Sequence, residues 1–422
     1  MHFVGLQSKK EMRIAVVLAL VVAVVSSSAV PESTSVKHGN LDWWENAIFY
    51  QIYPRSFKDS NGDGVGDIRG IIEKLDYLKE LGIAGAWLSP IFKSPMDDFG
   101  YDISDFKSVD PSFGTNEDLE ELFRKAKEKG LRIILDYVPN HTSDQHEWFQ
   151  KSVKRIHPYT DYFVWHDGKV VNGTRVPPNN WVSIFYGSSW EWNAERGQYY
   201  YHNFVVSQPD LNYRNPLVVQ EMKDVLTFWL DRGVAGFRID AIDYLFEAED
   251  LRDEPRSGKT DDPYHHNFTY HHFTKDMPET YDMVYQWRVV LDDWHKKNGG
   301  DAPIMMTEAY ANNSAVVKYF NSDDGKREGS HMPFNFALIT QLDETSTAWD
   351  FKDAIDNALA AVPKGKSFNW VLGNHDQPRV GSRYGIHKVD GLLTLVMTLP
   401  GVAVTYNVSV NWQSLHSTVS LS

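Results

Sequence analysis

The order of apolar runs and helical stretches constrains the fold of this 422-residue chain more than any other feature. Short runs rich in β-branched and aromatic residues alternate with amphipathic stretches, which is the pattern of a parallel sheet with crossover helices. The predicted strands are residues 47–53, 84–88, 132–137, 236–240, 303–307, 335–338, 368–372 and 402–406. The predicted helices are 71–81, 116–129, 216–232, 283–298 and 391–399. This order predicts an α/β protein folded as a (β/α)8 (TIM) barrel.

The alternation is interrupted once, after the third predicted strand. Residues 142–215 are rich in Trp, Tyr, Asn, Gly and Pro and have no clean helical period. A segment of this length is too long for an ordinary loop, so we predict an inserted subdomain there. The barrel would then be built from two parts of the chain, residues 30–141 and 216–407.

Carboxylates follow the apolar runs at three of the predicted strand ends. Asp240, Glu308 and Asp376 stand at these positions, and Arg238 comes two residues before Asp240. Residues two apart on a strand point to the same side, so the Arg238 guanidinium is expected to hold the Asp240 carboxylate ionised. A structural ion pair is the alternative for these two residues taken alone. Three acids at the carboxyl ends of barrel strands predict one pocket, and converging acids are the chemistry of glycosidic bond cleavage.

The N-terminus and the composition bear on location and partners. Residues 1–29 place three basic residues before an apolar run at 14–25, which is shorter than the roughly 20 residues that span a bilayer. Small residues follow, so a cleaved secretory signal is predicted. A net charge of −15 argues against nucleic acid, and the absence of cysteine excludes disulfides and zinc–thiolate sites. A secreted glycoprotein is consistent with N-x-S/T sequons at Asn140, Asn172, Asn267, Asn312 and Asn407.

Six motifs in a fixed order connect the chain to a known family. They are GYDISD (100–105), DYVPNH (136–141), QPDLN (208–212), GFRIDAI (236–242), TEAY (307–310) and NHDQPR (374–379). On these motifs the chain resembles the α-glucosidases (maltases) of glycoside hydrolase family 13, most of all the secreted insect maltases. The resemblance covers about residues 40–407.

The resemblance implies a role for each matching residue. It makes Asp240 the nucleophile, Glu308 the general acid/base and Asp376 the residue that stabilises charge at the anomeric carbon. A nucleophile implies a retaining mechanism, with about 5–5.5 Å between the two carboxyl groups of Asp240 and Glu308. The residues implied to bind the sugar in the reacting subsite are Asp102, His141, Arg238, His375 and Arg379.

The implied substrates rest on the residue after the nucleophile. In the family, a small residue at the position of Ala241 accompanies a preference for α-1,4 linkages. Maltose, sucrose and short malto-oligosaccharides are therefore the expected small-molecule partners.

A loop at residues 59–67 has the spacing of a cation site. Oxygen-bearing groups alternate along it as they do in an EF-hand, but the twelfth position is Gly70, so it is not an EF-hand. The resemblance implies a structural calcium ion on Asp59, Asn61, Asp63, the Val65 carbonyl and Asp67. A solvated acidic turn is the alternative, and no organic cofactor is expected.

The resemblance stops after Asn407. Residues 408–422 match nothing in the family, which continues with a last helix and a β-sandwich domain, and both are expected to be missing here. The eighth strand and helix 391–399 would then be uncovered, so the resemblance alone leaves open whether this form is active and whether it attaches to a membrane. Two other interpretations stay open. One is a catalytically silent binding ectodomain related to amino-acid transporter heavy chains, and the other is a relative that transfers or isomerises glucose.

Overall fold

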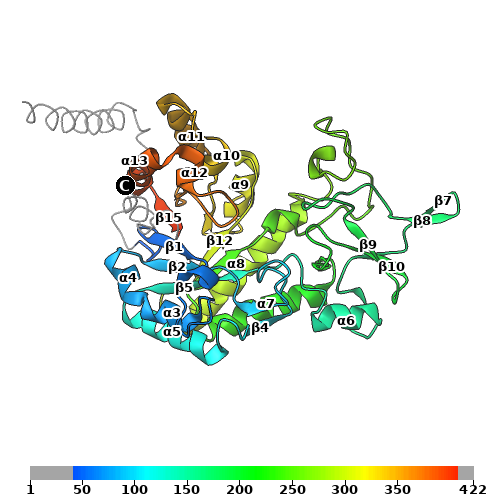
Figure 1. Ribbon diagram of the computed structural model, residues 1–422, viewed down its shortest axis with the longest axis horizontal. Coiled ribbons are helices and arrows are strands. Elements are labelled where there is room, and N and C mark those ends of the chain that lie inside the picture. Colours follow the sequence, from blue (N-terminus) through cyan, green and yellow to red (C-terminus); the bar gives the residue numbers. More distant parts are fainter. Residues whose placement is uncertain (1–40, 407–422) are drawn as a thin grey trace, which may run out of the picture. The chain divides into compact units, whose positions relative to one another are not determined.

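The computed structural model describes residues 41–406, which form a barrel with one long interruption (Figure 1). The predicted signal segment, residues 1–29, and the tail, residues 408–422, lie outside the described residues. Within residues 41–406, none of the helices combines the length and apolarity that a membrane crossing needs.

Eight parallel strands build the barrel, which confirms the predicted fold. Their order in the sheet is β13-β12-β11-β5-β2-β1-β15-β14, so barrel strands that follow one another in the chain pair with each other, except β13 and β14, which stand at the two ends of this order. Figure 1 shows the first strand (blue) beside the last (red), where Ile48 pairs with Ala403. The strands are β1 (Ile48–Ile52), β2 (Gly85–Leu88), β5 (Arg132–Tyr137), β11 (Gly236–Ile239), β12 (Ile304–Thr307), β13 (Met332–Pro333), β14 (Asn369–Val371) and β15 (Val402–Tyr406).

The predicted sixth strand, residues 335–338, is wrong. The strand at this place in the barrel is β13, two residues long, and residues 337–340 form the short helix α10 (Ala337–Thr340). The side-chain oxygen of Asn335 accepts a hydrogen bond from the Ala337 amide at 3.1 Å, which turns the chain into this helix. An apolar run that is buried on both sides carries no period that separates strand from helix.

The side chain of Asn369 joins the two strands at the ends of the sheet order, β13 and β14. It is fully buried, its oxygen accepts from the Asn335 amide at 2.9 Å, and its nitrogen donates to the Pro333 carbonyl. The side chain of Asn335 in turn donates to the Asn369 carbonyl at 3.2 Å. Side-chain hydrogen bonds therefore hold the barrel together where Pro333 has no amide hydrogen to give.

Helices cover the outer face of the barrel. One apolar cluster packs α3 (Ile68–Glu73), α4 (Leu75–Glu80), α5 (Asn116–Glu128), α7 (Pro216–Leu230) and α8 (Pro278–Asn298) on the barrel strands β1, β2, β5, β11 and β12. Local sequence fixes their starts: Thr115 and Asp118 form a capping box at α5, and Pro216 follows the capping Asn215 at α7. A second cluster packs α11 (Ala348–Ala361), α12 (Val380–Tyr384) and α13 (Val389–Thr398) on β14 and β15.

Within the described residues the eighth strand is buried, so its expected exposure is wrong, whereas the helix at 391–399 (α13) does leave Met397 44% exposed. Val402 and Val404 are buried inside the barrel, and Ala403 packs on its outer face against Leu392 and Val396 of α13. The helix that precedes β15 in the chain therefore covers it.

Alternation along the strands places polar side chains above an apolar filling. Phe49, Ile134 and Met306 belong to the cluster inside the barrel. Gln51, Asp136 and Glu308 stand two residues further along their strands and so share the same side. The carboxyl-terminal end of the barrel is thus lined with hydrogen-bonding and charged groups.

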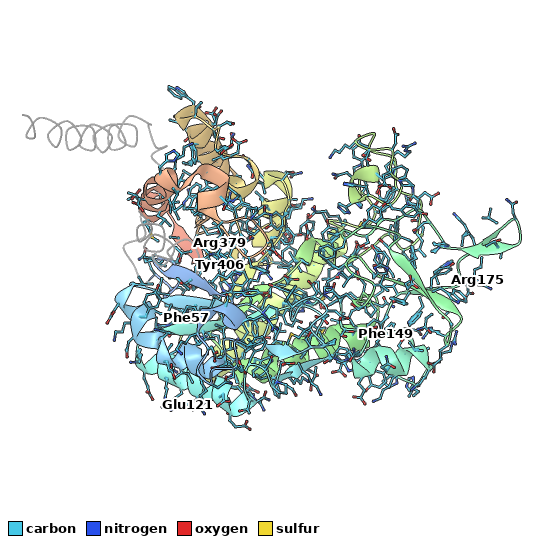
Figure 2. All side chains as sticks on the ribbon, in the orientation of Figure 1. Phe57, Glu121, Phe149, Arg175, Arg379 and Tyr406 are labelled. Atoms are coloured by element: carbon cyan, nitrogen blue, oxygen red, sulfur yellow. The ribbon has the colours of Figure 1, made fainter. Side chains whose placement is uncertain are left out.

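The segment between β5 and β11 forms small sheets of its own. It contains α6 (Glu147–Val153), a three-stranded sheet of β6 (Trp165–His166), β10 (Gln198–Tyr201) and β9 (Trp190–Asn193), and a hairpin of β7 (Lys169–Val171) and β8 (Thr174–Val176). Trp181, Trp190 and Tyr201 form a separate buried cluster. Figure 2 shows Arg175, on β8, at the edge of this segment away from the barrel.

Candidate active site

One guanidinium holds the carboxylates of the predicted nucleophile and acid/base. Arg238 on β11 is 1% exposed, and its Nη1 donates to Asp240, just beyond the end of the same strand. Its Nη2 lies 2.7 Å from Oε2 of Glu308, which follows β12. Arg238 pairs in register with Met306, so Glu308, two residues later, reaches the same side of the sheet.

The cluster around Arg238 holds more negative charge than this residue neutralises. Nη1 of Arg238 also donates to Oδ1 of Asp136 at 2.9 Å, so three buried carboxylates face one cation. Burial raises the pKa of Glu308 well above its usual value, against the opposing charge of Arg238. Burial also raises the pKa of Asp240 to about 7, again with Arg238 opposing. When Asp240 and Glu308 bind one proton between them, Glu308 therefore carries it, and a protonated carboxyl group is what a general acid requires.

Asp136 is a site residue to which sequence reasoning gave no role. It is 1% exposed and accepts hydrogen bonds from Trp87 Nε1 at 3.1 Å and the Tyr101 hydroxyl at 3.2 Å. Burial raises its pKa to about 6, with Arg238 opposing. Its signal was present in the sequence, because an acid two residues after the inward-facing Ile134 must point into the barrel end.

His375 connects the first strand to the end of β14. Its Nε2 lies 2.7 Å from the Tyr101 hydroxyl and its Nδ1 lies 2.9 Å from the Gln51 amide nitrogen. The rings of Tyr101 and His375 stack with centroids 5.3 Å apart. Burial lowers the pKa of His375 to about 4, so the ring is neutral at neutral pH.

Asp376 stands at the outer edge of the cluster. Its side chain is 42% exposed, and Oδ1 lies 3.3 Å from Nε2 of His375. Its backbone amide donates to the Asn374 side chain at 3.2 Å. The structure therefore brings all three predicted acids to the same end of the barrel, with Asp376 held less closely than the other two.

Asp102 and His141 are buried, and the protein itself occupies their polar atoms. Asp102 accepts from the Ser94 hydroxyl at 2.9 Å and from the amides of Asp97 and Asp98 at 2.9 and 3.0 Å. His141 makes contacts of 3.0 Å with the Asn140 side chain and 3.2 Å with the Tyr101 carbonyl. Burial lowers the pKa of His141 to about 3. Their contact with a sugar stays a prediction.

Ala241 and Arg379 take different positions. Ala241 has left-handed backbone angles (φ 44, ψ 39), and its amide donates to Oε2 of Glu308 at 3.1 Å. The turn after the predicted nucleophile is thus bonded to the predicted acid/base. Arg379 is exposed at the start of α12, and Figure 2 shows it beside Tyr406, the last residue of β15.

The loop at residues 59–67 offers hard oxygen donors on a tight turn. Gly62 and Gly64 have φ of 85° and 92°, which side chains rarely adopt. Asp59 accepts from the Gly64 amide at 2.8 Å, whereas Asp67 is buried and caps α3 through the Gly70 amide. Within the described part of the chain, no group of three or more His, Asp or Glu side chains is placed to hold a metal. The calcium ion stays a prediction.

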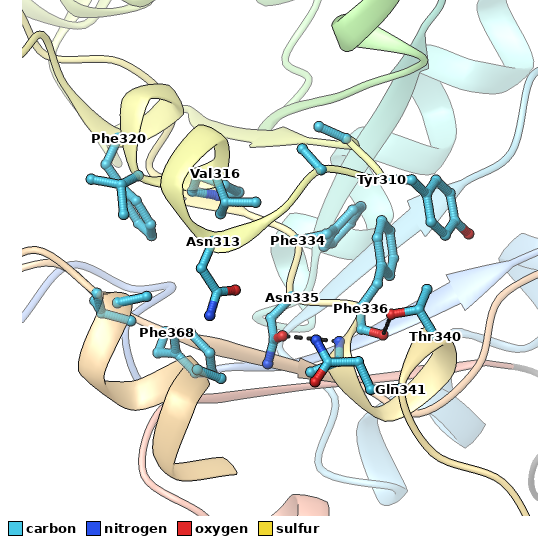
Figure 3. A pocket seen from close by; sticks show the side chains of 18 residues that line it. Tyr310, Asn313, Val316, Phe320, Phe334, Asn335, Phe336, Thr340, Gln341 and Phe368 are labelled. Atoms are coloured by element: carbon cyan, nitrogen blue, oxygen red, sulfur yellow. Dashed lines mark hydrogen bonds between the residues drawn. The ribbon is translucent and has the colours of Figure 1, made fainter. Parts of the chain in front are cut away.

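A cavity of about 170 Å³ lies behind the end of β12 (Figure 3). Phe334 and Phe336 line both this cavity and the narrow cleft at Arg238 and Glu308, so they stand between the two. Tyr310 stacks on Phe336 with ring centroids 4.3 Å apart, and Figure 3 shows its hydroxyl pointing away from the cavity.

The geometry defines a (β/α)8-barrel protein with a cluster of buried carboxylates at the carboxyl ends of its strands. The alpha-amylase catalytic domain matches residues 51–409, and the chain belongs to this family. It is 50% identical to Maltase 1 of Drosophila virilis over 407 residues, covering 96% of this chain and 64% of that protein. It is 52% identical to the salivary alpha-glucosidase of Anopheles gambiae over 397 residues, covering 92% and 66%.

A solved structure supports the fold, and one further relative is named as part of a transporter and not as a maltase or glucosidase. The alpha-glucosyl transfer enzyme XgtA matches with a TM-score of 0.78 and 40% identity, covering 88% of this chain and 69% of that one. A human amino acid transporter heavy chain is 42% identical over 397 residues, covering 93% of this chain and 56% of its own length. The chain spans less than two thirds of the length of the curated relatives named here.

Proposed function

We propose that this chain carries the catalytic domain of a retaining α-glucosidase. The substrates would be maltose, sucrose and short malto-oligosaccharides, from which it removes the terminal α-1,4-linked glucose. The observation that carries the proposal is the Arg238 cluster, in which one guanidinium contacts both Asp240 and Glu308 at the end of β11 and β12. Relatives named maltase and alpha-glucosidase support the same activity.

The first step divides the work between the two buried acids. A carboxylate oxygen of Asp240 attacks the anomeric carbon, the bond to the glycosidic oxygen breaks, and the proton of Glu308 passes to the leaving oxygen. Burial raises the pKa of both acids and Arg238 opposes this rise in both. The pKa of Asp240 reaches about 7, whereas that of Glu308 lies well above its usual value, so Asp240 ionises first and Glu308 keeps its proton. The product of this step is a β-linked glucosyl ester of Asp240.

The second step releases glucose. Glu308, now ionised, takes a proton from water, the water oxygen attacks the anomeric carbon, and Asp240 leaves as a carboxylate. Two inversions at one carbon give α-glucose. Asp376, with its partly exposed carboxylate, would stabilise positive charge on the sugar ring in both steps.

The test is glucose release from maltose by the purified chain, with Asp240→Asn as the inactive variant. Asp356→Asn, an exposed residue of α11, is the matched control and should leave activity unchanged. An NMR time course with sucrose, whose only glucose is the one transferred to Asp240, should show α-glucose before it mutarotates. A fully active Asp240→Asn variant, or β-glucose as the first product from sucrose, would contradict the proposal.

A silent binding ectodomain is the second candidate, since a transporter heavy chain is among the relatives. Arg238 and the three carboxylates that it contacts at one end of the barrel argue for catalysis instead; they are Asp136, Asp240 and Glu308. Folded protein that releases no glucose from maltose or sucrose would favour this candidate, and sucrose isomers as main products would favour a transferring enzyme.

We also propose secretion and a structural calcium ion. A salivary relative supports secretion.

The calcium would be held by Asp59, Asn61, Asp63, the Val65 carbonyl and Asp67, tying the loop after β1 to α3. A chelator should lower the melting temperature of the wild type more than that of Asp63→Asn. Equal melting curves with and without chelator would exclude the ion.

A further inference from the structure

Lys275 joins the segments that follow the two catalytic strands. Its Nζ lies 3.0 Å from Oδ2 of Asp243, three residues after Asp240, and donates to the Tyr310 carbonyl at 2.9 Å, two residues after Glu308. The Lys275 side chain is 23% exposed and that of Asp243 is 4% exposed. One largely buried ammonium group therefore ties the loop after β11 to the loop after β12.

The backbone next to Lys275 is fixed on the same loop. The amide of Asp276 donates to the Asp243 carbonyl at 2.7 Å, and Asp276 has a left-handed φ of 54°. Its carboxylate accepts from the Tyr319 hydroxyl on α9 (Asn313–Phe320) at 3.2 Å. The residue after Lys275 is thus hydrogen-bonded to Asp243 through its amide and to Tyr319 through its carboxylate. These two bonds restrict the position of the Lys275 ammonium group.

The Tyr310 end of this link leads on to the third acid. The Tyr310 hydroxyl accepts from the Asn374 side chain at 2.8 Å, and the oxygen of that side chain accepts from the Asp376 amide at 3.2 Å. A continuous set of contacts thus runs from Asp243 through Lys275, Tyr310 and Asn374 to Asp376. It touches all three catalytic segments.

The charge of Lys275 matters because Asp243, three residues after Asp240, is buried. Burial lowers the pKa of Lys275, but Asp243, Tyr244 and Asp276 together outweigh this and keep the pKa above its ordinary value, so the amine is charged. The other titratable groups around the pair are Tyr244, whose ring lies 5.2 Å from Nζ, and Asp276, with Tyr281 and Tyr319. Burial lowers the pKa of His266 and of His271, and the charge of Lys275 lowers both further. Without Lys275, the charge of Asp243 would lack its cation.

We infer that Lys275 is a positioning residue that sets the placement and the charge environment of Asp240 and Glu308 without touching the substrate. The inference rests on the proposed function, because it concerns how that site is assembled.

The test compares Lys275→Met with the wild type in kcat, KM and the pH dependence of kcat/KM, using maltose. Kcat should fall at least about tenfold, because small displacements of catalytic groups are costly, with a smaller change in KM. Both limbs of the pH profile should move to higher pH, since removal of a cation raises carboxyl pKa values. Lys352→Met, which removes an exposed lysine paired within α11, is the matched control and should leave kcat and both limbs unchanged.

A second variant, Asp243→Asn, is expected to shift the pH profile in the opposite direction, and it serves as the test if Lys275→Met does not fold. Asp243→Asn keeps the ammonium group and its bond to Tyr310 but removes the negative charge, so both limbs should move to lower pH. The double variant Asp243→Asn/Lys275→Met should return the limbs toward those of the wild type. Limbs that stay in place in Asp243→Asn, or an unchanged kcat in folded Lys275→Met, would overturn the inference. An inactive, folded wild type would overturn the proposed function itself.

Discussion

The two sides of the barrel end hold their catalytic residues in different ways. Asp240 and Glu308 lie just after β11 and β12, each of which pairs with a strand on both sides, and they are 8% and 6% exposed and share one buried guanidinium. Asp376 follows β14, the strand at the end of the sheet order; its side chain is 42% exposed and lies near a neutral histidine. The side of β11 and β12, here called the central side, thus has a permanent cation and strand pairing on both flanks. On the β14 side, β14 pairs with β15 alone among the described strands and is joined to β13 by side-chain hydrogen bonds.

This difference separates two demands of the proposed reaction. The carboxyl groups that exchange protons and form a covalent bond need fixed geometry, which a buried ion cluster between paired strands provides. A carboxylate that only stabilises charge on the sugar can stand nearer to solvent. The Tyr310–Asn374 hydrogen bond is a direct link between the two sides.

The largest expected effect comes from Arg238→Lys on the central side. Lysine is a compact charge and cannot contact three carboxylates as the planar guanidinium does. We expect kcat on maltose to fall about a hundredfold or more, because the two reacting carboxyl groups lose their common anchor. Arg383→Lys is the matched control on the β14 side, where the guanidinium donates to the carbonyl of Pro378. A larger loss for Arg383→Lys would reverse the comparison.

Asn369→Ala tests the hydrogen bonds that join β14 to β13. It leaves the half-buried Asn335 amide and the buried Pro333 carbonyl without these partners, so we expect a loss of about 2 kcal/mol in unfolding free energy. Urea unfolding measures this change. Kcat should fall less than in Arg238→Lys, because Asp240 and Glu308 keep their contacts. A folded variant of unchanged stability would show that these side-chain bonds do not support the barrel.

The smallest expected effect is on the pH profile of His375→Asn. The pKa of His375 lies at about 4, so between pH 5 and 8 the substitution removes no charge. Both limbs of the kcat/KM profile should stay in place, even though kcat falls through loss of the Tyr101 contact. For the wild type, activity should rise with pH as Asp240 ionises and fall at higher pH as Glu308 loses its proton. A shifted acidic limb in His375→Asn would assign that limb to the histidine.

The sequence alone located most of the barrel and the acids that the structure gathers. Seven of the eight predicted strands overlap observed ones, because each is a compact apolar run with β-rich composition and a clear end. Arg238 and Asp240 face the same side because alternation along a strand is a local rule. The prediction of the sixth strand was wrong because β13 is only two residues long, which is too short to show the alternation of a strand.

Only the tertiary structure decided the contacts between segments far apart in the chain. Asp136 joins Arg238 across 102 residues, and Lys275 joins Tyr310 across 35. Local sequence states which side of a strand a residue faces, but not which charges from other strands will surround it. Those neighbours set the pKa values of Asp240 and Glu308, because burial and nearby charge act through space.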